Sequence, residues 1–164
     1  MCLVTSNPAS DTAVLFSGGW DSLYCYSVAL RDGITPDLLF FDYGQEYVSE
    51  ELAAVSSMNL PRLVTNKLPD IASSKGIFDM RNLRLLEFCQ RAGYRRVYFG
   101  TRNLLPIFDK YKDSNWYWAK QQGRQLGIDI RVPTTCLPKF FIIDACRARL
   151  PDASRYVFST EGLS

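Results

Sequence analysis

The sequence of this 164-residue chain contains no histidine. Its absence excludes histidine-dependent catalytic triads, zinc sites with mixed Cys and His ligands, and imidazole acid–base catalysis. The five cysteines are dispersed, and no two of them form a C-x-x-C pair; they are Cys2, Cys25, Cys89, Cys136 and Cys146. An odd, scattered set of cysteines indicates reduced thiols in a reducing compartment rather than a disulfide framework.

Long apolar runs are also absent, so the sequence predicts no transmembrane helix and no membrane partner. The first residues, MCLVTSNPASD, lack the basic and apolar regions of a signal peptide, and we expect a cytoplasmic protein. A net charge of +2 is too small to imply nucleic-acid binding. The length and the 47% hydrophobic content predict one soluble globular domain over residues 1–164.

Strand-like and helix-like segments alternate along the chain. We predict strands at residues 12–16, 37–41, 62–65, 96–99 and 129–132, with a further strand at 156–158. We predict helices at residues 20–31, 46–57, 81–92 and 114–126 and from 138 onward, and a loop over the site at 66–79. This order implies an α/β fold with a doubly wound, mostly parallel sheet of about five strands, and ligands bind beyond the carboxyl ends of such strands.

The motif S-G-G-W-D-S lies between the first predicted strand and the first predicted helix. Gly18 and Gly19 allow a sharp turn and a close approach to a ligand, and the helix start favours an anion. Ser17 and Ser22 add hydroxyl donors, whereas Asp21 would repel a bare phosphate and therefore indicates Mg²⁺ between the carboxylate and the phosphates. The segment predicts a pyrophosphate cradle; a tight turn without a ligand is the alternative.

This motif is neither a Walker A loop nor a dinucleotide-binding fingerprint. It resembles the pyrophosphatase loop of the PP-loop ATP-pyrophosphatase superfamily, whose members form an adenylate, release pyrophosphate and admit a nitrogen or sulfur nucleophile. One strand later, F-D-Y-G-Q at residues 41–45 resembles a segment of the 7-cyano-7-deazaguanine synthase family. These enzymes make the nitrile precursor of queuosine-type bases from 7-carboxy-7-deazaguanine, ammonia and ATP.

Weaker similarity to this family continues to about residue 145. R-N-L at 81–83, V-Y-F-G at 97–100 with a later Asn103, Y-K-D at 111–113 and L-P-K at 137–139 resemble its segments. The family ordinarily ends in a cysteine-rich zinc site that includes C-x-x-C, and this sequence lacks that pattern. We therefore expect a compact relative with no zinc site, in which the full nitrile chemistry is not assured.

The resemblance implies roles for individual residues. The expected ATP-binding residues are Phe16, Ser17, Gly18, Gly19, Trp20, Asp21, Ser22, Phe41 and Tyr43. Asp21 would hold Mg²⁺ through the phosphates, and Lys139 would stabilise the charge that develops at the α-phosphate. Arg81 and Asn82 would contact the substrate carboxylate or the purine edge, and Asp113 would accept hydrogen bonds from a guanine-like N1–H and amino group.

Several of these residues also have plainer interpretations. Lys139 fits a solvated lysine in the first turn of a helix, and Arg81 fits a surface charge. Asn82 and Asp113 fit residues that cap the start of a helix, and Phe41 fits the hydrophobic core.

Together these features predict an adenine-nucleotide α-hydrolase-like (HUP-type) domain that uses ATP and Mg²⁺. The expected function is activation of 7-carboxy-7-deazaguanine, or a close relative, for attack by ammonia, with an amide or a nitrile as product. One alternative is a tRNA-modifying enzyme of the same superfamily, and another is a nucleotide-binding module without turnover. The resemblance and the aromatic residues near Trp116 also suggest a homodimer.

Overall fold

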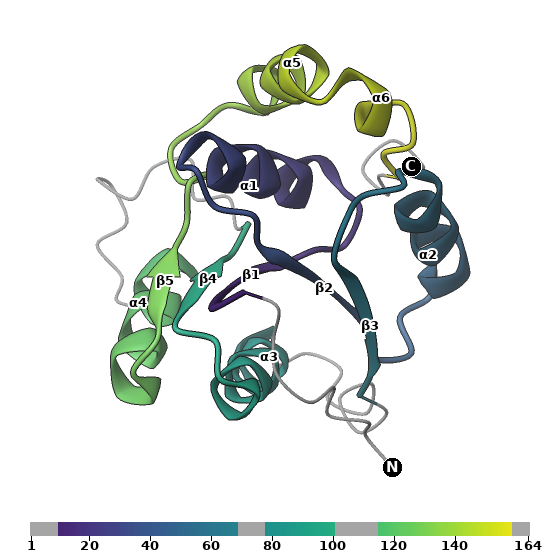
Figure 1. The fold of residues 1–164 in the computed structure, drawn as a ribbon. Helices are drawn as coiled ribbons and strands as arrows, with labels where there is room; N and C mark the ends of the chain where they lie inside the picture. Colours follow the sequence, from purple (N-terminus) through teal and green to yellow (C-terminus); the bar gives the residue numbers. More distant parts are fainter. Residues whose placement is uncertain (1–9, 69–77, 101–114, 159–164) are drawn as a thin grey trace.

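The computed structural model describes residues 10–68, 78–100 and 115–158, with side chains from residues 82 and 120 onward in the last two ranges. Within these ranges five strands form one sheet: β1 (Thr12–Leu15), β2 (Asp37–Asp42), β3 (Leu63–Lys67), β4 (Arg96–Tyr98) and β5 (Asp129–Arg131). Their order is β3-β2-β1-β4-β5, and every neighbouring pair is parallel. The structure confirms the predicted doubly wound parallel sheet (Figure 1).

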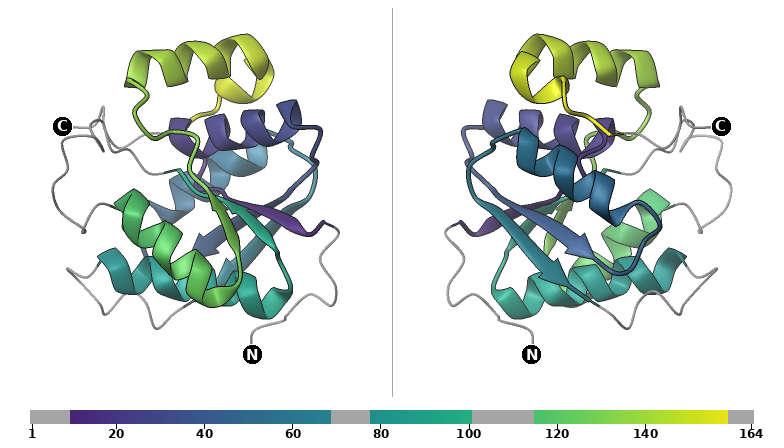
Figure 2. Two further views of the ribbon diagram at one scale, coloured as in Figure 1. Left: turned by 90° about the vertical axis from the view of Figure 1, so that its left-hand side faces the viewer. Right: turned by 90° about the vertical axis from the view of Figure 1, so that its right-hand side faces the viewer.

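Helices cover both faces of this sheet (Figures 1 and 2). They are α1 (Trp20–Arg31), α2 (Val48–Ser57), α3 (Phe78–Ala92), α4 (Asn115–Leu126), α5 (Lys139–Arg149) and α6 (Pro151–Ser154). One face carries α1, α2, α5 and α6, and the other carries α3 and α4. None of the described helices is long and apolar enough to cross a membrane.

The two faces of the sheet contribute to two separate hydrophobic clusters. Val14 and Leu38 pack with α1 and α5, whereas their neighbours Ala13 and Leu39 pack with α3 on the opposite face. This alternation is the two-residue period of a strand. Helices on both faces explain why β1 and β2 are buried along almost their whole length and have nearly continuous apolar sequences. Helix α1 buries all of residues 22–29 because it lies between the sheet and α5.

The predicted strand at residues 156–158 is wrong. Pro151 begins the short helix α6, as suits a residue with no N–H to donate in the first turn of a helix. After α6 the chain turns, and the N–H of Phe158 donates to the carbonyl of Gly18 (3.3 Å) rather than to a sheet edge. An apolar run of three residues is too short to distinguish a strand from a segment that packs over a turn.

The hydrophobic cluster beneath α3 contains the buried thiol of Cys89. This thiol should make the free energy of unfolding depend on pH in the alkaline range. Burial raises the pKa of Cys89 from its ordinary 9.0 to about 12. Because this pKa is higher in the folded chain, the stabilisation is complete below about pH 9 and is lost as the pH rises towards 12. We expect this thiol to lower the free energy of unfolding by about 1.4 kcal/mol per pH unit over that interval.

Urea unfolding at pH 8, 9 and 10 measures this slope. Cys89→Ala is the matched control, since it should reduce stability at every pH through the cavity it leaves but give a shallower pH dependence. Equal slopes for the two proteins would contradict the prediction.

Candidate active site

The candidate site lies at the carboxyl edge of the sheet, between the ends of β1 and β4. The chain runs from β1 to β2 on one side and later returns to place β4 on the other, a reversal that leaves a crevice at the strand ends. Gly100, two residues after the end of β4, approaches the start of α1: a Cβ at this position would lie 3.1 Å from the Cβ of Asp21. A Cβ here would press on the backbone of Asp21, so glycine lets β4 end close to the turn that follows β1.

The turn between β1 and α1 leaves the start of the helix open. Gly18 has a φ of +83°, and the next residue, Gly19, is the N-cap and offers no side chain to cap the helix. The Ser22 hydroxyl donates to the Gly19 carbonyl (3.0 Å) and accepts from the backbone N–H of Ser17 (3.3 Å), which fixes the turn from within. An uncapped helix start of this kind is suited to an anion.

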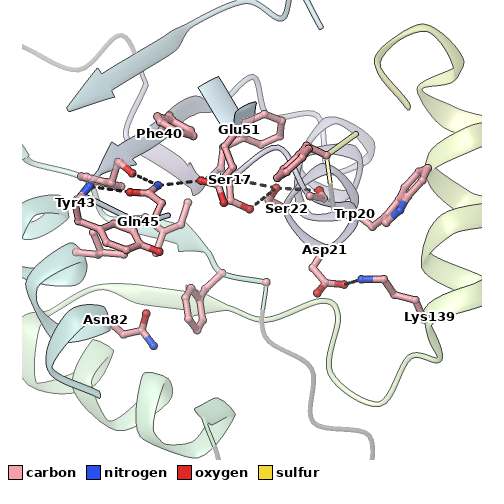
Figure 3. Close-up of a pocket in the computed structure, with 18 residues that line it drawn as sticks. Ser17, Trp20, Asp21, Ser22, Phe40, Tyr43, Gln45, Glu51, Asn82 and Lys139 are labelled. Carbon is pink, nitrogen blue, oxygen red and sulfur yellow. Dashed lines mark hydrogen bonds and ion pairs between the residues drawn. The ribbon is translucent and has the colours of Figure 1, made fainter. Parts of the chain in front are cut away.

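Asp21 and Lys139 meet at this helix start although 118 residues separate them. Asp21 lies in the first turn of α1, Lys139 is the first residue of α5, and the two helices pack side by side. The Lys139 Nζ lies 3.5 Å from the Asp21 Oδ1, and the side chains are 23% and 25% exposed. The pair is thus partly shielded from solvent and still open to a ligand (Figure 3).

A pocket of about 290 Å³ joins this ion pair to the end of β2 (Figure 3). Its lining includes most of the predicted site residues, namely Phe16, Ser17, Gly19, Trp20, Asp21, Ser22, Phe41, Tyr43, Asn82 and Lys139. Gly18 is not among these residues; it belongs to the same turn but lies against Val55 of α2. Arg81 belongs to α3 but its side chain is outside the described part of the structure, and Asp113 lies outside the described residues altogether.

The end of the pocket near Tyr43 is apolar in part, since Tyr43 packs against the hydrophobic cluster that contains Leu85 and Phe99. Asn82 reaches this end from α3; the residue is 3% exposed, and its Nδ2 has no hydrogen-bond partner within the described part of the chain. An unpaired buried donor costs about 1–3 kcal/mol, so this amide is suited to donate to a bound ligand. Phe41 is 6% exposed and its ring packs edge-on against Phe88. This agrees with the interpretation of Phe41 as a residue of the hydrophobic core.

The other residues that line the pocket had no predicted role: Leu15, Phe40, Gln45, Glu51, Leu85, Phe99, Gly100 and Phe158. Gln45 belongs to the F-D-Y-G-Q segment, so the sequence offered a local signal for it, whereas Glu51 lies beyond that segment in α2, next to Glu50, and had no such signal. Phe158 offered none, because it reaches the pocket only through the path of the chain after α6.

Thiol and acidic groups do not gather into a metal site in the described structure. Within residues 10–68, 78–100 and 115–158, no three His, Cys, Asp or Glu side chains are placed to hold a metal ion together. Cys25, Cys89 and Cys146 are buried as free thiols, and Cys136 is exposed. Cys25 and Cys89 belong to the hydrophobic core.

Known proteins share this sequence pattern and this fold. A model of the family described as queuosine biosynthesis protein QueC matches residues 11–106, more than half of the chain. A 7-cyano-7-deazaguanine synthase from Solidesulfovibrio magneticus is 47% identical over 51 residues, which are 31% of this chain and 22% of that protein. The matched segment thus spans about a fifth of this curated relative's length.

A solved structure of a predicted subunit of tRNA methyltransferase from Methanocaldococcus jannaschii superimposes with a TM-score of 0.58. Its sequence is 17% identical, and the match covers 84% of this chain and 75% of that one. Identity this low establishes similarity of fold alone. On the strength of the family match, the chain belongs to the QueC family of queuosine biosynthesis proteins, within the PP-loop superfamily.

Proposed function

We propose that this chain uses ATP to activate 7-carboxy-7-deazaguanine as an adenylate for attack by ammonia, releasing pyrophosphate and AMP. The observation that carries the proposal is the Asp21–Lys139 pair beside an uncapped helix start. The proposal treats residues 1–164 as one PP-loop domain. The first product is the amide, and a second activation of that amide would give the nitrile.

In the proposed reaction, the β- and γ-phosphates of ATP occupy the turn at residues 17–22. A substrate carboxylate oxygen attacks the α-phosphorus, the bond to the bridging oxygen breaks, and pyrophosphate leaves. Lys139 stabilises the negative charge that develops at the α-phosphate, and Ser17 and Ser22 hold the departing pyrophosphate. Ammonia then attacks the activated carbonyl, loses a proton and displaces AMP. Positioning and electrostatics supply most of the rate.

The partly apolar end of the pocket, near Tyr43, is the proposed site for the aromatic heterocycles. Tyr43 would pack against adenine, which Phe41 would contact through its backbone, and Asn82 would donate to an acceptor on a ligand ring or on the substrate carboxylate. Arg81 and Asp113 remain proposed contacts to the substrate carboxylate and to its guanine-like edge.

The residues present also suit Mg²⁺. A single carboxylate, such as that of Asp21, together with phosphate oxygens is the ligand set that Mg²⁺ prefers in nucleotide sites. Bound there, Mg²⁺ would supply positive charge that offsets the phosphates.

Incubation with ATP, Mg²⁺, ammonia and 7-carboxy-7-deazaguanine tests the proposal. We expect AMP to form only when the deazaguanine substrate is present, and the product mass to correspond to the amide or the nitrile. Chromatography measures AMP, and mass spectrometry identifies the product. AMP that required tRNA instead would favour a tRNA-modifying enzyme. Nucleotide binding without any AMP would favour a module without turnover, and either result would contradict the proposal.

A further inference from the structure

The side chain of Gln45 ties together three parts of the chain around the pocket. Its Oε1 accepts a hydrogen bond from the backbone N–H of Tyr43 (3.0 Å). Its Nε2 donates to the carbonyl of Phe41 (3.0 Å) and to the Oε2 of Glu51 (2.9 Å). One amide therefore connects the end of β2, the loop that follows and the start of α2, and it sets the position of the Glu51 carboxylate.

Glu51 brings a negative charge to the pocket, near the turn that is suited to phosphates. It belongs to the first turn of α2, where the helix dipole favours a carboxylate. Its backbone carbonyl would lie 3.7 Å from a Cβ at Gly18, so this part of α2 borders the turn. Because like charges repel, the carboxylate is unsuited to contact phosphates directly, and unless a cation bridges them, as proposed for Asp21, it should face hydrogen-bond donors of the ligand.

The order of side chains along the pocket identifies which donors these are. In Figure 3, Asp21 and Lys139 lie towards one end, Tyr43 and Asn82 towards the other, and Glu51 between them. A nucleotide with its phosphates at the turn and its base near Tyr43 places its sugar in the middle. The donors on that sugar are the ribose hydroxyls.

We propose that Glu51, positioned by Gln45, is a specificity-determining residue that accepts a hydrogen bond from a ribose hydroxyl of the bound nucleotide. This inference rests on the proposed function, because it requires a nucleoside triphosphate in the pocket. A carboxylate offers about four acceptor positions, so Glu51 can accept a hydroxyl in addition to the hydrogen bond from Gln45.

Calorimetric titration with ATP, 2′-deoxy-ATP and 3′-deoxy-ATP in the presence of Mg²⁺ tests the role of Glu51. A hydrogen bond to a carboxylate predicts that the unmodified protein binds ATP about tenfold or more tightly than at least one deoxy analogue. Glu51→Ala should bring that ratio close to one, and Glu51→Gln should give an intermediate ratio because its amide oxygen is an uncharged acceptor. Glu50→Ala, an exposed neighbour in the same helix, is the matched control and should keep the ratio.

Gln45→Ala tests the positioning role. It should lower the ATP-to-deoxy-ATP ratio, which a general loss of stability would not change, and circular dichroism verifies that each variant is folded. Equal binding of ATP and both analogues by the unmodified protein, or a ratio that Glu51→Ala leaves intact, would overturn this inference alone. Failure of the unmodified protein to bind any of the three nucleotides would overturn the proposed function as well.

Discussion

Replacing Lys139 with alanine is expected to reduce the rate of AMP formation by about 10²- to 10³-fold, the usual loss when a charge-stabilising group is removed. The substitution also leaves the carboxylate of Asp21, 3.5 Å away, without this partner beside the phosphates. Stability should change by only about 0–1 kcal/mol, because the ion pair is partly exposed. Steady-state kinetics with varied ATP, together with urea unfolding, measure both quantities.

Three further variants test whether the loss of AMP formation arises from the proposed site. Lys139→Arg should retain part of the activity because it keeps the charge, and Asp21→Asn should be about as damaging as Lys139→Ala. Arg91→Ala removes a positive charge from the exposed last turn of α3, at the amino edge of the sheet, and should have no effect. A rate for Lys139→Ala within about threefold of the unmodified protein would remove Lys139 from the mechanism.

Gly18→Ala is expected to lower the free energy of unfolding by about 2–5 kcal/mol and to abolish nucleotide binding. The backbone at Gly18 has a φ of +83°, which costs a residue with a Cβ about 1–2 kcal/mol. In addition, the new Cβ would lie 2.6 Å from the Cγ2 of Val55, so the Val55 side chain, or α2 with it, would have to move away from the turn. Urea unfolding and calorimetric titration with ATP measure the two effects.

Gly33→Ala provides the matched control. Gly33 has a similar φ of +77°, but a Cβ there would meet no atom within 4 Å. Gly33→Ala should therefore lower the free energy of unfolding only by the cost of the backbone conformation, and nucleotide binding should be unaffected. Equal destabilisation by the two substitutions would mean that the contact between the turn and α2 is not needed.

The turn and its helix could be predicted from sequence because neighbouring residues encode them. Gly18 and Gly19 break the strand pattern, and α1 has the predicted bounds, Trp20–Arg31. The parallel sheet followed from the alternation of strands and helices. The meeting of Asp21 with Lys139 has no local signal. It depends on the packing of α5 against α1, and only the family resemblance pointed to Lys139.

Features created by packing between distant segments could not be predicted. The segment around Phe158 contacts the turn because α6 redirects the chain, whereas its sequence alone resembled a strand. Glu51 is one of two adjacent acidic residues in α2, and only the hydrogen bond from Gln45 and the position of the pocket distinguish it from Glu50. The homodimer and the cytoplasmic location stay predictions.

The close approach of Gly100 to Asp21 has a consequence for when the site is formed. Both strongest motifs lie before residue 52, so they leave the ribosome early. The wall of the pocket that Gly100 provides forms only when β4 pairs with β1, and Lys139 arrives later still, with α5. The nucleotide site therefore becomes complete only after Lys139 has been made and α5 has packed, long after the residues that identify the family have been made.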